Sequence, residues 1–319
     1  MKRFLAVAVV ALVASFTSCD FIPGGGGGTG GGSGGGGGQQ FAKGFVYVRR
    51  DDKNLYISDE RDFMSTTRLT EGGGAKHPSM QKDGSRVVFI RTTSTDSEIA
   101  MVPTAGGMVS TVLVASTTAS ARNFRTPVFT PDGTKIVFAY DEGAGSSVGI
   151  VNTDGSGFRR IAGGSALSYS AISVYPDGSG VLAAAGNSPA QLTQLEKLSL
   201  VGGTAVNITN TLGTEALGIA TRAVVSPDGT KAAFDARISS GSVRIFVIDL
   251  MTKVVTQLTD YPGEPGANDS APCWVGNDKV GFSSDTGGND QVYALPATGV
   301  KTSGGLQLAG GTEPWYGPN

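Results

Sequence analysis

The chain has 319 residues, with 25 Lys and Arg against 27 Asp and Glu, one His and two Cys. This near balance of charge argues against nucleic-acid binding, which needs a basic patch or stripe. Its 49 glycines are about twice the usual share and helical periodicity is scarce, so the composition favours a β-rich fold with many tight turns.

Residues 1–18 have the features of a secretory signal peptide. The start, Met1–Arg3, is basic, and Phe4–Phe16 is an apolar stretch too short to span a bilayer. Small residues then precede Cys19, which resembles a bacterial lipoprotein signal, in which the Cys is acylated and becomes the first residue. We therefore expect Cys19 to carry lipid. A cleaved signal peptide with an incidental Cys is the alternative.

Residues 19–40 join this Cys to a glycine-rich segment. Gly24–Gly38 is interrupted only by Thr29 and Ser33, and this composition predicts a flexible tether. A phosphate-binding loop would need a Lys, a preceding strand and a following helix, which this segment lacks. We expect the tether to carry residues 41–319, which suffice for one large domain.

A short pattern recurs through residues 41–319: a Pro or its replacement, an aromatic or β-branched residue, Asp-Gly, and an apolar run. Asp-Gly between apolar runs predicts a tight hairpin, because Gly accepts the positive φ that such turns need. Two more strand-like runs follow each hairpin, so each period of roughly 40–50 residues predicts one four-stranded propeller blade. Four copies share the Asp, at spacings of 49, 45 and 51 residues, and a fifth is degraded: Asp83, Asp132, Asp177, Asp228 and Pro272–Asp278.

Both ends of this region carry an incomplete blade. Three strand-like runs, Phe45–Val48, Leu55–Ser58 and Thr67–Leu69, precede the first hairpin, and Pro314–Asn319 matches a first strand that has no blade of its own. Pairing the two ends completes a sixth blade and removes open edges. We therefore predict an all-β, six-bladed propeller with four antiparallel strands per blade, closed by the C-terminal strand. A solenoid or sandwich leaves these strands unexplained. Asn187–Lys197, with the chain's one short helical pattern, is predicted to be a long inserted loop.

The repeat is similar to that of the TolB-type six-bladed propeller family. The resemblance rests on hairpins such as Pro127–Gly133, on the turn Asn152–Gly157, and on the strand ends Arg68–Thr70 and Gln257–Thr259. It extends over residues 41–319 and is specific for the fold rather than for a function. TolB carries an α/β domain ahead of its propeller, where this chain has its glycine-rich segment, so a role in the Tol system does not follow.

Residues for catalysis or metal binding are sparse. His77 is the only His, so a zinc site, a Ser-His-Asp triad and the clustered His of similar propeller lyases all lack their side chains. Carboxylate pairs such as Asp51-Asp52 are interpreted as solvated turn charges. We expect no enzyme activity, no catalytic residue, no metal and no cofactor. Cys273 is expected to be a small core residue.

The residues just before each predicted first strand would surround one mouth of the central channel. Their charged and titratable side chains form a candidate binding rim, and a hydrated polar funnel without a ligand is the alternative. The rim residues are Lys76, His77, Arg125, Arg222, Asp269 and Glu313.

We expect a lipid-anchored, non-catalytic, monomeric protein of the bacterial envelope, facing the periplasm or the cell surface. It would bind an envelope protein or peptide at the rim, with no nucleic-acid partner. A glycan or small-ligand binder is a second hypothesis, with Trp274, Trp315 and Tyr316 as stacking platforms, although their place in first strands favours packing between blades. A third is a propeller enzyme, such as a polysaccharide lyase or hydrolase, with a cation held by Asp269 and Glu313.

Overall fold

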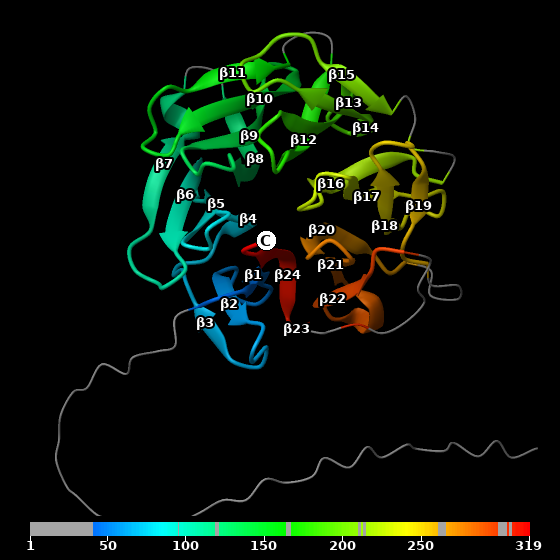
Figure 1. The fold of residues 1–319 in the computed structure, drawn as a ribbon. Coiled ribbons are helices and arrows are strands. Elements are labelled where there is room, and N and C mark those ends of the chain that lie inside the picture. Colours follow the sequence, from blue (N-terminus) through cyan, green and yellow to red (C-terminus); the bar gives the residue numbers. More distant parts are fainter. Residues whose placement is uncertain are drawn as a thin grey trace, which may run out of the picture. The chain divides into compact units, whose positions relative to one another are not determined.

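The computed structural model describes residues 41–94, 96–118, 121–163, 167–209, 212, 215–260, 266–298, 305 and 308–319. The predictions for residues 1–40, including the lipidated Cys19, lie outside these residues. The described part of residues 41–319 forms one unit of six sheets around a central axis (Figure 1). No helix in this described part is long and apolar enough to cross a membrane.

Each sheet is a blade of four antiparallel strands, as the repeats predict. The first strand of each repeat is the innermost one (Figure 1). In blades 1 to 3 the strands, from the inside outward, are β24 (Gly311–Gly317), β1 (Gly44–Arg49), β2 (Leu55–Asp59) and β3 (Thr66–Arg68); β4 (Ala75–Met80), β5 (Arg86–Thr92), β6 (Ser97–Pro103) and β7 (Ser110–Val114); and β8 (Arg122–Phe129), β9 (Lys135–Glu142), β10 (Gly145–Asn152) and β11 (Arg159–Ala162).

Blades 4 to 6 repeat this order, and two short 3-10 helices, η1 (Ala115–Thr117) and η2 (Thr286–Gly288), lie in connections. In these blades the strands are β12 (Ser168–Val174), β13 (Val181–Ser188), β14 (Gln191–Leu198) and β15 (Val206–Thr209); β16 (Gly218–Val225), β17 (Lys231–Arg237), β18 (Val243–Asp249) and β19 (Val255–Gln257); and β20 (Asp269–Val275), β21 (Lys279–Ser284), β22 (Gln291–Pro296) and β23 (Leu308–Ala309).

Blade 1 closes the ring in the predicted way. Strand β24 pairs antiparallel with β1, with Phe45 opposite Tyr316 and Val46 opposite Trp315. The rings of Phe45 and Tyr316 meet edge to face, with centroids 5.0 Å apart. Since the last strand is hydrogen-bonded to the first described strand, the inner edge of β1 is covered.

The hydrophobic core lies between the blades, with one cluster at each of the six interfaces. At the junction of blades 6 and 1, Cys273 packs with Phe45 and Tyr316. Cys273 is a free thiol that is only 1% exposed, and burial raises its pKa to about 12. The prediction that Cys273 is a core residue is therefore confirmed.

The Asp-Gly turns between the first two strands use one local mechanism. The Asp132 carboxylate accepts the backbone N–H of Thr134, at 3.1 Å, and Gly133 adopts a φ of 68°. Asp228 accepts the N–H of Thr230 in the same way, at 3.0 Å. This side-chain mimic of a backbone turn explains why Asp recurs there.

Residues Asn187–Lys197 are not a long loop, so that prediction is wrong. They form the end of β13 and most of β14, which pair as a hairpin. Ala185 faces Gln194 and Gly186 faces Leu192, so one extra residue bulges from β14. Because of the bulge, the buried residues Leu192 and Leu195 are three positions apart instead of two. A spacing of three is typical of a helix, so the sequence pattern here resembles a helical one.

Deleting Gly311–Asn319 is expected to abolish cooperative melting or cause aggregation. It removes β24 and exposes the β1 edge and the buried Phe45, which costs several kcal/mol against a total stability of roughly 5–15 kcal/mol. Circular dichroism melting measures this, with deletion of the exposed Asn319 alone as the control. A truncated protein that melts like the full chain contradicts closure of the ring by β24.

Candidate functional site

All six inner strands break their pairing register at the same level of the channel. In five of these strands the residue at the break has a positive φ, between 44° and 53°. In the sixth strand, β16, the equivalent residue is Arg222, and its φ is not positive. Left-handed backbone is costly for residues other than Gly, so neighbouring contacts must hold it. The five residues are His77, Thr126, Ala171, Ala271 and Glu313.

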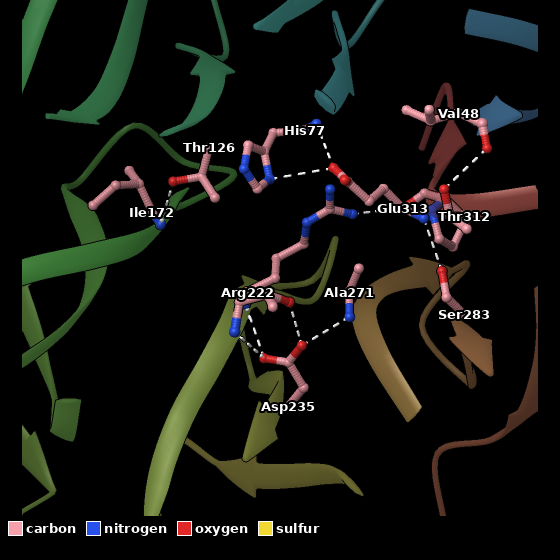
Figure 2. A network of polar contacts seen from close by, with 12 residues as sticks. Val48, His77, Thr126, Ile172, Arg222, Asp235, Ala271, Ser283, Thr312 and Glu313 are labelled. Atoms are coloured by element: carbon pink, nitrogen blue, oxygen red, sulfur yellow. Dashed lines mark hydrogen bonds and ion pairs between the residues drawn. The ribbon is translucent and has the colours of Figure 1, made fainter. Parts of the chain in front are cut away.

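Hydrogen bonds between neighbouring blades supply those contacts (Figure 2). At five of the six interfaces an N–H of an inner strand donates to a side chain of the preceding blade, always in the same direction around the ring. The donor and acceptor pairs are Glu313 to Ser283 Oγ (2.8 Å), His77 to the Glu313 carboxylate, Ile172 to Thr126 Oγ1 (3.2 Å), Val225 to Ser173 Oγ (3.1 Å) and Ala271 to Asp235 Oδ2 (2.8 Å).

Asp235 on β17 is the most heavily used acceptor of this ring. Besides Ala271 N–H, it accepts the N–H groups of Thr221, at 2.8 Å, and Arg222, at 2.9 Å, and the Thr221 hydroxyl. The side chain is fully buried. Sequence reasoning missed this residue, although a charge inside the apolar run from Ala232 to Ala236 was a usable signal, since a buried charge needs partners.

Arg222 and Trp315 fill the centre of the ring. Arg222 is 3% exposed, its Nη1 donates to the Pro314 carbonyl at 2.7 Å, and its guanidinium lies 5.9 Å from the centre of the Trp315 ring. Burial lowers the pKa of Arg222, and Glu313 opposes this effect. Trp315 packs against three of the six interface clusters. Arg222 therefore lies on the side of the charged mouth, and Trp315 lies between it and the opposite mouth.

Glu313 and His77 form the centre of the charged mouth (Figure 2). The Glu313 carboxylate accepts His77 N–H and lies 3.3 Å from His77 Nδ1. Burial lowers the pKa of His77; Glu313 opposes the shift, whereas Arg222, Lys76 and Arg125 add to it. Five predicted residues thus gather into what we call the rim cluster: Lys76, His77, Arg125, Arg222 and Glu313.

The outer members of the rim cluster differ in how they are held. Arg125 donates to Asp141 Oδ1 at 2.6 Å and to the Asn123 carbonyl at 3.0 Å. The Lys76 side chain is exposed and makes no hydrogen bond or ion pair with any residue in the described part of the chain. Both lie within their inner strands, rather than just before them as the sequence suggested, because those strands begin earlier. Lys76 thus offers an unpaired ammonium group at the mouth.

Asp269 does not join the rim cluster, contrary to the sequence prediction. It is fully buried, and burial raises its pKa against the opposing effect of the Ser284 and Thr259 hydroxyls. In β20, Asp269 occupies the position that the buried Ala75 occupies in β4. This position is one residue further from the register break than the position of Lys76. Since side chains alternate along a strand, this position faces a blade interface rather than the channel.

The opposite mouth of the channel holds an apolar pocket of about 250 Å³. Its walls are the C-terminal ends of the inner strands, including Met80, Phe129 and Val225, with Trp315 among its lining residues. From the sequence, Trp315, in a first strand, was expected to pack between blades rather than to line a pocket. Trp274 and Tyr316 are 1% and 5% exposed, so neither offers a free face for glycan stacking.

No group of three or more His, Cys, Asp or Glu side chains is arranged to hold a metal ion among the residues that the structure describes. No protein-family model matches the chain, and no curated protein resembles it in sequence.

Solved structures resemble the chain in fold. TolB from Acinetobacter baumannii is 17% identical with a TM-score of 0.66, over 87% of this chain and 67% of that one. A putative TolB from Agrobacterium tumefaciens is 16% identical with a TM-score of 0.58, over 85% and 91%. An oligogalacturonate lyase from Vibrio parahaemolyticus is 16% identical with a TM-score of 0.56, over 80% and 74%. Such identities show the fold alone. The protein is a six-bladed β-propeller, and its fold is TolB-like, as its repeats predicted.

Replacing Asp235 by Ala is expected to cost about 3–5 kcal/mol of stability, because the buried N–H groups of Arg222 and Ala271 and the part-buried N–H of Thr221 lose their acceptor. Urea unfolding measures the change. Asp278→Ala, at an exposed turn position, is the control and should change little. A loss below 1 kcal/mol for Asp235→Ala would show that Asp235 is not needed to hold the inner strands.

The titration of His77 provides a pH test, because it is the only His of the chain. Its folded pKa lies below the usual 6.5, so the unfolded chain binds the proton more readily and stability falls as pH drops below about 6.5. A single imidazole resonance followed by NMR should titrate below 6.5. His77→Gln should remove the part of the stability loss that begins there. A midpoint at or above 6.5 contradicts the buried, cation-flanked position.

Proposed function

We propose that the protein is a lipid-anchored, non-catalytic component of the bacterial envelope that binds a protein or peptide at the rim cluster. The observation that carries the proposal is the convergence of Lys76, His77, Arg125, Arg222 and Glu313 at one channel mouth. Charged side chains gathered at one mouth give a partner several polar contacts in fixed relative positions.

Glu313 and His77 of the rim cluster are held in place before a partner arrives. Glu313 and His77 sit on strained inner-strand backbone that interblade hydrogen bonds hold, so little conformational freedom would be lost on binding. The positive groups of the rim cluster are unevenly neutralised: Arg125 has Asp141, whereas Lys76 has no described partner. This favours a partner segment that brings a carboxylate to Lys76.

The enzyme hypothesis lacks a specific observation in its favour. The similarity to the oligogalacturonate lyase concerns the fold alone. His77, the chain's single His, is held against Glu313 in a cluster that depresses its protonation. The binding scaffold therefore fits the side chains at hand better than a lyase or hydrolase does.

Capture from envelope extracts tests the rim. Lys76→Glu and Arg125→Ala, made together, should abolish retention of the partner, because they reverse or remove the two outermost charges without touching the buried Arg222. Lys279→Glu, at an exposed position outside the rim cluster, is the matched control. Equal melting temperatures establish that the fold is retained. If the double variant captures the same proteins as the wild type, the partner does not bind at the rim.

The anchor is tested through Cys19. Replacing Cys19 by Ser should leave the circular dichroism unchanged and move the protein from the detergent phase to the aqueous phase. Each buried methylene of an acyl chain contributes roughly 0.8 kcal/mol to membrane binding. The N-terminal peptide of the wild-type protein should carry an acyl mass increment. Wild-type protein with an unmodified N-terminal peptide that partitions into water would refute the anchor.

A further inference from the structure

Exposed large apolar side chains concentrate at one kind of connection. Seven such residues occur in the described part of the chain, and six lie in, or directly at the end of, the connection from a third strand to an outermost strand. Only Leu217 lies elsewhere. The six occur in four different blades and are Met64 (90% exposed), Met108 (89%), Val201 (82%), Val206 (61%), Met251 (86%) and Val254 (60%).

These connections share one face of the propeller. Each inner strand runs from the rim-cluster end of the channel to the pocket end, where four of the six lead into an Asp-Gly turn, and two reversals bring the third strand back to that end. Contacts confirm this: Thr104 Oγ1 donates to the Gly84 carbonyl at 2.7 Å, and Leu250 N–H donates to the Thr230 carbonyl at 2.9 Å. We call this side, which also holds the apolar pocket, the turn face. It lies opposite the rim cluster.

The chain enters the propeller on the turn face. Gly44 begins β1 opposite Gly317, which lines the pocket. The N–H of Ala42 donates at 3.1 Å to Oδ2 of Asp59, the last residue of β2, after which the connection that carries Met64 begins. Ala42, near the start of the described residues, therefore lies on the side of the propeller that carries the exposed apolar side chains.

We infer that the turn face rests on a lipid bilayer, with Met64, Met108, Val201 and Met251 inserted among the headgroups, an inference that rests on the lipid anchor proposed above. Isolated exposed apolar residues are ordinary, but side chains presented on one face by four blades suit an apolar surface that extends beneath all of them. The rim cluster then points away from the bilayer, where a partner has access to it.

The turn face carries charges of both signs, including the exposed Lys82 and Lys253 beside the carboxylates of its turns, so we expect apolar insertion rather than attraction to anionic lipid. Its Asp-Gly turns present carboxylates such as Asp132 and Asp228, and these are already held by hydrogen bonds within their own turns. Contact should therefore form on zwitterionic lipid and persist at high salt, where electrostatic attraction is screened.

The test uses the full-length, lipidated protein on phosphatidylcholine vesicles. A polarity-sensitive dye is placed through Met64→Cys, Met108→Cys or Met251→Cys; Cys273 is buried and does not compete for labelling. Ser239→Cys, exposed in the β17–β18 connection on the opposite side, is the matched control. Flotation establishes that the protein is on the vesicles, and brominated acyl chains quench dyes that reach the bilayer.

Quenching at Met64, Met108 and Met251 should exceed quenching at Ser239 several-fold and survive high salt. Equal quenching at all four positions in protein that floats would overturn the inference and spare the anchor. Quenching that disappears at high salt would also overturn it, because the contact would then be electrostatic. Protein that does not float would refute the anchor and the inference together.

Discussion

The ring of hydrogen bonds around the channel is the interaction on which the rest of the molecule depends. Each left-handed residue of an inner strand costs roughly 1–3 kcal/mol, and such backbone persists only where its surroundings hold it. Those surroundings are supplied by the preceding blade, so no blade can adopt its geometry alone. Glu313 shows the coupling most directly, because it donates to Ser283 of blade 6 and accepts from His77 of blade 2.

Ring closure and the rim cluster therefore depend on the same strand, β24. Strand β24 comes last in the chain, yet it carries Glu313, the carbonyl that binds Arg222, and Trp315 at the centre of the ring. The buried charge of Asp235 is tolerated because inner-strand N–H groups donate to it, and the buried Arg222 donates to the Pro314 carbonyl. The same strand thus stabilises the fold and shapes its charged mouth.

Much of the fold is predictable from local chemistry. Each Asp-Gly turn in the repeats predicts a hairpin. Because each end of the region carries an incomplete blade, pairing of Pro314–Asn319 with the N-terminal strands is the arrangement that leaves no strand unpaired. Five rim residues follow from the register of the inner strands. Asp269 was misplaced because a shift of one residue along a strand moves a side chain to the other face.

Other features depend on contacts that no local pattern reveals. The extra residue in β14 imitates a helical period, and only pairing with β13 exposes it as a bulge. Asp235 acquires its role from Ala271 of the next blade, 36 residues away. The turn face emerges only when four separate connections are found on one side of the ring.

Native-state hydrogen exchange tests most directly whether the interblade hydrogen bonds hold the ring together. The amides of His77, Ile172, Val225, Ala271 and Glu313 donate across blade interfaces, so they should exchange only through global unfolding, with one shared free energy of opening. If these five amides exchange as fast as those of the exposed turns while the outer strands stay protected, the interblade bonds do not hold the ring.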